Sequence, residues 1–323
     1  MTKLGLYFDV RNPPQWRRPY PELYQRTLEL CVRADRAGMH RIWLTEHHGF
    51  DDGYLPQPLT LAAAIAARTE RVRLGTAVLL AGLRHPVQLA EEAAIVDIIS
   101  DGRLDLGVGT GYRPTEFALF GIDDSKRFAA VESAVREIVR LWDEEIVTPR
   151  PVQDPMSMWG GFFGPRGARF AGELGMGLLA IDPRLLEPYR AGLEAGGRPA
   201  DTARMAGVLS VVLADDPEAA WPRIAPHVAY QADSYNRHAI MGTDQNPFPP
   251  ADPERMRNPK PGREPRVVVA TPDDAAAFIR RRVAGLPVEE VFIWATIGAM
   301  PDDVVDRHLE LAVELRDLLL EDD

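Results

Sequence analysis

The stretch RVRLGTAVLLAGLRHPVQLAEEAAIVDIISDGRLDLGVG, residues 71–109, decides the fold class. It holds two short β-rich runs, Val72–Leu80 and Arg103–Val108, on either side of the Ala- and Ile-rich run Leu89–Ile99, which is helical in character. The second β-rich run alternates its apolar side chains with period two, as a strand does. A strand, a helix and a second strand in this order predict a parallel βαβ unit.

The same alternation extends along the chain. Apolar residues at 128, 131, 135, 138 and 142, and a similar set from 304 to 318, fall on single helix faces. Eight strand-like runs separated mostly by helices predict an α/β fold, a (β/α)8 TIM barrel of the chain 1–323 with insertions, because eight strands close such a barrel. A doubly wound sheet is the alternative. The runs are Leu4–Phe8, Arg41–Leu44, Val72–Leu80, Arg103–Val108, Trp159–Phe163, Gly177–Ile181, Val208–Leu213 and Val291–Trp294.

The composition excludes several classes of protein. Lys plus Arg number 37 and Asp plus Glu 48, which gives a net charge of −11 over 323 residues. This acidic balance argues against nucleic-acid and anionic-membrane partners, and no run of 18 apolar residues predicts a membrane span. The single cysteine, Cys31, excludes a disulfide framework and a Cys-rich metal site. No secretory leader precedes the first strand, so we expect a cytoplasmic protein.

Three proline-rich segments interrupt the alternation: Arg11–Pro21, Val147–Ser157 and Asp244–Pro265. The last holds seven prolines in 22 residues. None can form a regular helix or a central strand. We interpret the segments near 147–157 and 244–265 as insertions into a single barrel domain. They are either surface insertions or loops that shape a substrate pocket, because long loops in compact folds often have that function.

Chemistry-bearing residues follow four of the strand-like runs. In a βα barrel the active site lies at the C-terminal ends of the strands. We therefore expect these segments to meet on one rim. They are Leu44-Thr45-Glu46-His47-His48, Gly75-Thr76-Ala77-Val78, Gly107-Val108-Gly109-Thr110-Gly111-Tyr112 and Gly160-Gly161-Phe162-Phe163-Gly164-Pro165-Arg166-Gly167.

The pair His47-His48 is the strongest catalytic signal. Neighbouring side chains of an extended segment point to opposite sides, so we expect one histidine in the pocket and one in a structural role. An imidazole titrates near neutrality and suits general acid/base or hydrogen-bonding chemistry. A metal site is the alternative. Adjacent histidines seldom chelate one metal, and the sequence has no H-E-x-x-H motif and no Cys partner, so we expect none.

Two features indicate where a phosphate would bind. The glycine-rich run 107–111 lacks the G-x-G-x-x-G spacing of a dinucleotide fingerprint, so we interpret it as a close backbone approach to a flat or anionic ligand. The helix start at Gly164–Gly167 offers free backbone N–H groups. Arg127, Arg166 and Arg169 are candidate cations beside it, and a solvated surface position is the alternative for each.

Taken together, these motifs resemble the bacterial luciferase-like flavin monooxygenases over nearly the whole chain. The resemblance is carried by Trp43 to His48, by Arg71 to Val78, by His85-Pro86-Val87 and by Ser100 to Gly109. It implies a barrel that holds reduced flavin at the C-terminal ends of its strands. His47 corresponds to the family's active-site histidine and Glu46 to the adjacent acid. Ala77–Val78 falls where the family often has a non-proline cis peptide beneath the flavin ring.

The resemblance also implies a set of cofactor-binding residues. Two departures stand out: the alkanal-oxidising luciferases have Arg at the position of Thr110, and an Ala-Glu-Ser segment at the position of Phe162-Phe163-Gly164. Arg127 and the helix start at Gly164–Gly167 are therefore expected to bind more of the phosphate. The full set is Ala77, Val78, Gly109, Thr110, Gly111, Tyr112, Arg127, Phe163, Gly164 and Gly167.

The function implied is that of a monooxygenase. Reduced FMN would arrive from a separate reductase, because we find no nicotinamide-binding motif. Dioxygen would form a peroxyflavin that oxidises a small organic substrate, with His47 as its proton-transfer or hydrogen-bonding partner. One alternative is hydride transfer with a deazaflavin coenzyme; another is a non-catalytic flavin-binding subunit. Oligomers are common in the family, and the Leu89–Ile99 helix is a candidate interface for a homodimer.

Overall fold

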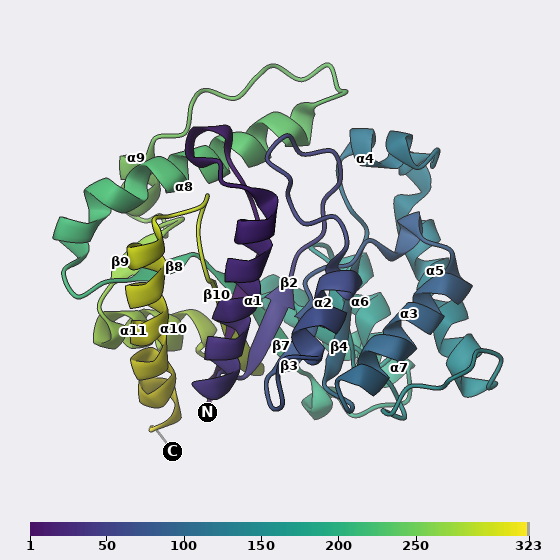
Figure 1. The fold of residues 1–323 in the computed structure, drawn as a ribbon. Coiled ribbons are helices and arrows are strands. Elements are labelled where there is room, and N and C mark those ends of the chain that lie inside the picture. The colour runs from purple at the N-terminus through teal and green to yellow at the C-terminus, as the bar shows by residue number, and fades with distance from the viewer. Residues whose placement is uncertain (322–323) are drawn as a thin grey trace.

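The computed structural model describes residues 1–321, in which eight parallel strands close into a barrel (Figure 1). Around the barrel the order is β1-β10-β7-β6-β5-β4-β3-β2. The barrel prediction is therefore confirmed, and the doubly wound alternative is wrong. The strands are β1 (Lys3–Phe8), β2 (Arg41–Leu44), β3 (Arg73–Thr76), β4 (Leu104–Gly109), β5 (Met158–Gly161), β6 (Gly177–Leu179), β7 (Met205–Leu209) and β10 (Val288–Trp294).

Proline marks the start of most helices. Within residues 1–321, eight of the eleven α-helices have proline at one of their first two positions, where its missing N–H costs no hydrogen bond. The helices are α1 (Tyr20–Arg36), α2 (Pro58–Ala66), α3 (Pro86–Ile99), α4 (Pro114–Leu119), α5 (Arg127–Asp143), α6 (Pro165–Glu173), α7 (Leu186–Ala195), α8 (Pro217–Ile240), α9 (Pro253–Arg257), α10 (Pro272–Val283) and α11 (Asp302–Leu320).

The seventh predicted run, Val208–Leu213, is wrong in its boundaries because it spans two strands of different sheets. The barrel strand β7 ends at Leu209. After Ser210 the chain forms β8 (Val211–Leu213), which pairs in parallel with β9 (Val268–Ala270) in a separate two-stranded sheet. The run is continuously apolar on both sides of this change of sheet, so periodicity could not locate it.

Other boundaries also differ from the prediction, among them the end of β3 and the starts of two helices. Strand β3 ends at Thr76, although the apolar run continues to Leu80, because the chain turns at a cis peptide bond between Ala77 and Val78. The segments predicted to lack regular helix also hold the first two residues of α1 and the five-residue helix α9. Proline at the first or second position is compatible with both.

Side chains fill the N-terminal half of the barrel interior. Trp43, Trp159 and Phe292 are almost fully buried in one layer. One layer nearer the strand starts, the Arg41 guanidinium bonds to Glu290 at 2.6 Å and to Asp105 at 2.9 Å. Burial raises the pKa of Glu290 to about 7, against the opposing effect of the arginine. This packing leaves the C-terminal half of the interior open to a ligand.

Helix α8 lies across that open end (Figure 1). The long segment 241–265 runs over α8 at the top of the drawing, and both termini lie at the opposite end of the barrel. Among residues 1–321, no helix is both long and apolar enough to cross a membrane.

Candidate active site

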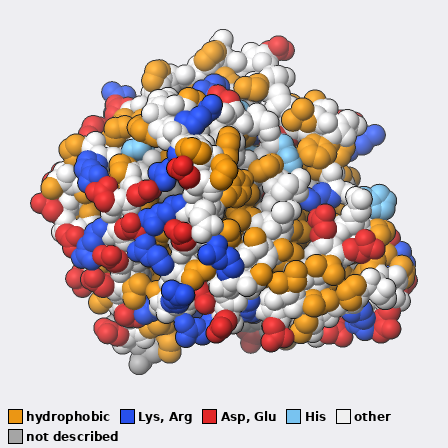
Figure 2. Space-filling model, in the orientation of Figure 1, with side chains coloured by type: hydrophobic (Ala, Val, Ile, Leu, Met, Phe, Trp, Pro, Cys, Tyr) orange, Lys and Arg blue, Asp and Glu red, His pale blue; other side chains and the backbone are white. Residues whose placement is uncertain are grey.

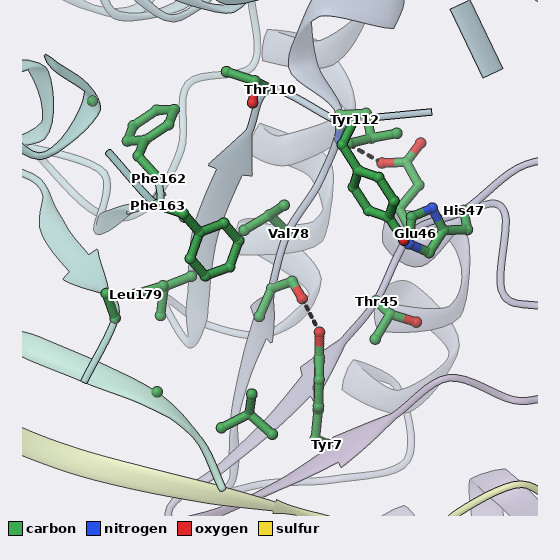
Figure 3. A pocket seen from close by; sticks show the side chains of 18 of the residues that line it. Tyr7, Thr45, Glu46, His47, Val78, Thr110, Tyr112, Phe162, Phe163 and Leu179 are labelled. Atoms are coloured by element: carbon green, nitrogen blue, oxygen red, sulfur yellow. Dashed lines mark hydrogen bonds between the residues drawn. The ribbon is translucent and has the colours of Figure 1, made fainter. Parts of the chain in front are cut away.

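A cavity of about 570 Å³ opens among the C-terminal ends of the strands (Figure 3). Eleven of the twelve residues predicted from the sequence line it, including Glu46, His47, Thr110 and Arg127. The exception is Gly109. Nine aromatic side chains dominate the lining: Tyr7, Tyr54, Tyr112, Phe128, Phe162, Phe163, Tyr235, Phe292 and Trp294. The four expected strand-end segments therefore do converge on one rim.

The floor of the cavity is the cis peptide between Ala77 and Val78. The hydroxyl of Tyr7 donates a hydrogen bond to the Ala77 carbonyl (Figure 3). Beneath Val78, two glycines leave room for its methyl groups, because a Cβ on Gly109 or Gly161 would lie 2.3 or 2.2 Å from them. Gly109 is buried under the floor and does not line the cavity, so its predicted part in cofactor binding would be to make room for Val78.

The imidazole of His47 lies at one wall, next to Glu46 and Tyr112 (Figure 3). Its Nδ1 is 2.7 Å from Oε1 of Glu116, a fully buried residue in the first turn of α4. The same oxygen accepts the backbone N–H of His48 at 2.8 Å and Nη1 of Arg113 at 3.1 Å. Sequence reasoning missed Glu116 and Arg113, although both follow the glycine-rich strand end within seven residues.

Burial and hydrogen bonding fix the protonation state of this pair. Burial lowers the pKa of His47, and the opposing effect of Glu116 does not restore it. Burial alone would raise the pKa of Glu116, but its bonds to His47 and His48 and the charge of Arg113 hold it below the usual range. A neutral imidazole beside a carboxylate must donate from Nδ1. The Nε2 atom then carries the lone pair and can accept a proton from a ligand.

Glu46 also borders the cavity, but its carboxylate is fully engaged. Oε1 accepts from Arg84 at 2.8 Å and lies 2.9 Å from Nε2 of His48, while Oε2 accepts the backbone N–H of Leu80 at 2.7 Å. The ring of His48 faces away from the cavity and packs on Phe120. One histidine thus lies in the pocket, while the other joins Glu46 in holding the loops after β2 and β3.

The outer rim combines a flat aromatic surface with groups suited to an anion. Phe163 is 92% exposed, and the α6 N-terminus beside it presents free backbone N–H groups at Gly164–Gly167. Arg127 lines the same cavity and bonds only to the Asp124 carbonyl among the described residues. Arg166 and Arg169, the other candidate cations, instead pair with Glu132 and Glu173 and do not border the cavity.

These residues fit a flavin-type coenzyme. The apolar floor, with glycines beneath it that leave no space for a Cβ, can support a flat ring system. Thr110, Arg127 and the N–H groups of Gly164–Gly167 can hold a phosphate. Among the described residues, no group of three or more His, Cys, Asp and Glu side chains is arranged to hold a metal ion.

Comparisons with known proteins agree with this geometry. A family model described as luciferase-like monooxygenase matches residues 4–310. The oxygenase component of a flavin-dependent trigonelline monooxygenase from Acinetobacter baylyi is 35% identical over 170 residues, 48% of this chain and 47% of that protein. An F420-dependent glucose-6-phosphate dehydrogenase from Kineococcus radiotolerans is 33% identical over 199 residues, 53% and 58% of the two chains. The chain thus spans about half the length of these curated relatives.

A solved structure matches over a longer range. The crystal structure of the monooxygenase RslO1 from Streptomyces bottropensis superposes with a TM-score of 0.79. It is 27% identical, and the match covers 97% of this chain and 98% of that one.

Proposed function

This chain belongs to the luciferase-like monooxygenase family, and we propose that it is the oxygenase of a two-component system. In this proposal it takes reduced FMN from a separate reductase and uses dioxygen to oxidise a small organic substrate. The similarity to the oxygenase component of trigonelline monooxygenase and to RslO1 supports this function. The observation that carries it is the neutral His47, held by Glu116 at the wall of a cavity suited to a flat coenzyme.

Each part of the cavity has a role in this proposal. Ala77, Val78 and Phe163 would hold the flavin ring, and Gly111 and Tyr112 would border it. Thr110, Arg127 and the backbone of Gly164–Gly167 would hold the phosphate. Reduced FMN, when bound, supplies the electrons that activate dioxygen. The apolar walls would keep water from the reacting atoms.

His47 is the residue that would move a proton. Its unprotonated Nε2 can accept a proton from the substrate or hold one for return. Glu46 would act as a positioning residue, because each of its oxygens already holds a neighbouring group. General acid/base groups contribute about 10²–10⁴-fold to rates. We therefore expect His47→Ala to lower substrate oxidation by at least about 10²-fold, and a change within about twofold would exclude this role.

Hydride transfer with a deazaflavin is the second candidate function. The similarity to an F420-dependent dehydrogenase favours it, as does the presence of Thr110 where the alkanal-oxidising luciferases have an arginine. The same cavity could hold either coenzyme, and His47 would then donate a proton or orient the hydride acceptor. A non-catalytic flavin-binding subunit is disfavoured, because the chain keeps His47 and its hydrogen-bonded carboxylate.

Anaerobic titration separates these functions. The protein would be titrated with reduced FMN and, separately, with reduced deazaflavin, and each sample would then be mixed with aerated buffer while its absorbance is followed. Tight binding of FMN followed by slow, protein-dependent reoxidation would support the oxygenase. A preference for deazaflavin with no reaction toward oxygen would support hydride transfer. Tight binding without turnover of any substrate by either coenzyme would favour the subunit.

We also infer a homodimer through helix α3. Its residues Ile95, Ile98 and Ile99 are 39–44% exposed, and Figure 2 shows hydrophobic side chains gathered near the C-terminal end of this helix. Exposed apolar patches of this kind often mark protein–protein contacts. Sedimentation velocity should give a dimer for the native chain and a monomer for Ile95→Glu. A native chain that sediments as a monomer at 50 µM or so would exclude this interface.

A further inference from the structure

We propose that the cavity selects an uncharged aromatic substrate whose hydroxyl or ketone oxygen binds the hydroxyl pair of Tyr54 and Tyr235. This inference rests on the proposed function, because it names the substrate class of the same site. Tyr54 comes from the loop after β2, and Tyr235 comes from α8. Both side chains line the cavity beside His47. Their ring centroids are 4.8 and 6.2 Å from that of the imidazole.

Counting hydrogen bonds shows why this pair can bind an oxygen. The two hydroxyls are 2.8 Å apart, and either one can be the donor. One bond between two hydroxyls uses one proton and leaves the other O–H free to donate. By contrast, the hydroxyls of Tyr7 and Thr45 already donate to the carbonyls of Ala77 and Phe8. The tyrosine pair therefore offers a ligand an uncommitted donor deep in the cavity.

The side chain of Arg11 packs against both rings of the tyrosine pair. Its guanidinium carbon lies 4.4 Å from the ring centre of Tyr54 and 4.5 Å from that of Tyr235. The guanidinium is itself fixed by Asp9 at 3.0 Å, by Asp52 at 2.7 Å and by the hydroxyl of Ser234 at 2.8 Å. All of these groups are buried. The two tyrosines thus pack against a buried cluster in which Arg11 is held by two carboxylates and a hydroxyl.

The same arrangement argues against charged substrates. An anion would approach the carboxylates of Asp9 and Asp52, which outnumber the single charge of Arg11, and Arg113 is already paired with Glu116. A cation would compete with the Arg11 guanidinium for the two rings, because its carbon already lies 4.4 and 4.5 Å from the ring centres. Burying either charge without a partner is costly. A neutral, flat molecule with one oxygen acceptor meets neither penalty.

Four probes of similar size test this selection. They are 2-naphthol, naphthalene, 2-naphthoate and N-methylquinolinium, whose binding would be followed by fluorescence in the presence of dithionite-reduced FMN under nitrogen. We expect 2-naphthol to bind about tenfold more tightly than either charged probe, and about fivefold more tightly than naphthalene, the ratio that one net hydrogen bond gives. Equal or tighter binding of the anion or the cation would overturn the proposal.

Variants locate the binding. Tyr54→Phe and Tyr235→Phe should each weaken 2-naphthol binding about fivefold and leave naphthalene binding unchanged. Tyr24→Phe makes the same chemical change on α1, outside the cavity, and should alter neither. Two variants keep the test valid if one of them fails to fold. If the variants weakened the binding of 2-naphthol and of naphthalene equally, the proposal would be overturned, because the hydroxyls would then bind no oxygen.

The test of the substrate class can fail or succeed independently of the test of the oxygenase assignment. If neither coenzyme binds while 2-naphthol still shows its dependence on Tyr54 and Tyr235, the substrate class stands and the oxygenase assignment fails. If reduced FMN binds and 2-naphthol does not, the substrate class fails and the oxygenase assignment is untouched. Displacement of 2-naphthol by reduced FMN would place the probe in the coenzyme's space and would also overturn the proposal.

Discussion

Glu116 Oε1 lies 2.7 Å from His47 Nδ1, although the two residues are 69 positions apart in the sequence. The contact joins the loop after β2 to the first turn of α4, so it exists only when strands β2 and β4 hold their places in the barrel. The histidine most suited to proton transfer is therefore oriented by the fold itself and not by its sequence neighbours.

Removing the charge of Glu116 should shift the pH dependence of the reaction. The carboxylate raises the pKa of His47, so in Glu116→Gln that pKa should fall further. If neutral His47 is the base, the acid limb of the kcat/KM profile should move to lower pH, and kcat should fall about tenfold. Glu137→Gln, on the exposed face of α5, is the control. An acid limb that stays in place would mean that it does not report His47.

The same carboxylate should matter for stability. Glu116→Ala leaves the guanidinium of Arg113 buried without its partner, and losses of about 3–5 kcal/mol follow when one member of a buried ion pair is removed. Glu116→Gln keeps an acceptor for the His48 N–H and should cost less. Urea unfolding monitored by circular dichroism gives both values. Small losses for both variants would show that the charge of Arg113 is compensated elsewhere, and equal losses would show that the acceptor for the His48 N–H contributes nothing.

Arg127 should bind the phosphate and leave the ring unaffected. Because it lines the rim of the cavity, Arg127→Ala should weaken binding of FMN about tenfold while leaving binding of riboflavin, which has no phosphate, unchanged. Isothermal titration of both ligands provides the comparison. Arg166→Ala is the matched control, because this arginine pairs with Glu132 outside the cavity. If Arg127→Ala weakened the binding of FMN and of riboflavin equally, Arg127 would contact the ring system and not the phosphate.

Much of the fold follows from sequence because strands and helices carry local patterns. Alternation and apolar runs located all eight barrel strands, since each side of a barrel strand is buried by neighbours or by a helix. The seventh boundary failed at Leu209, where the chain leaves the barrel for β8 with only Ser210 between the two apolar strands. The three-residue strand β9 is too short to show any period.

Some residues of the candidate site could also be predicted from the sequence, and others could not. Residues at strand ends, such as His47 and Thr110, could be predicted because barrel topology brings strand ends to one rim. The sequence could not predict that Glu116, Tyr54 and Tyr235 belong to the site. Each reaches it from a helix or loop whose position depends on tertiary packing. That Gly109 does not line the cavity could not be predicted either, for a related reason. Whether a strand residue faces the cavity or the layer beneath it depends on side-chain direction, which a glycine does not reveal.

The floor of the cavity should be sensitive to one added methyl group. In Gly161→Ala the new Cβ would lie 2.2 Å from a methyl carbon of Val78, which must then move. We expect binding of reduced FMN to fall at least about tenfold, since overpacking a fixed site costs about 1–3 kcal/mol. Ala64→Val, which adds methyl groups at an exposed position of α2 outside the cavity, is the control. Unchanged binding in Gly161→Ala would mean that Val78 does not support the ring.

His308 should make the fold sensitive to acid. Its Nδ1 accepts the Leu213 N–H and its Nε2 donates to the Trp294 carbonyl, both at 2.9 Å, so the neutral ring joins β8 to β10 from helix α11. Burial lowers its pKa to about 4, against the smaller opposing effect of the bond to Trp294. Below pH 6.5 the unfolded chain takes up this proton and the folded chain does not. The stabilisation is therefore complete above pH 6.5 and is lost as the pH falls toward 4, by up to about 3 kcal/mol.

A neutral amide at this position isolates that contribution. In His308→Gln we expect lower stability at pH 7, because the two hydrogen bonds are less well made, but a smaller further loss between pH 6.5 and pH 4 than in the native chain. Urea unfolding at four or five pH values would measure both. His85→Gln, at an exposed position before α3, should keep the native slope. Parallel pH curves for His308→Gln and the native chain would show that some other group takes up the proton that destabilises the fold in acid.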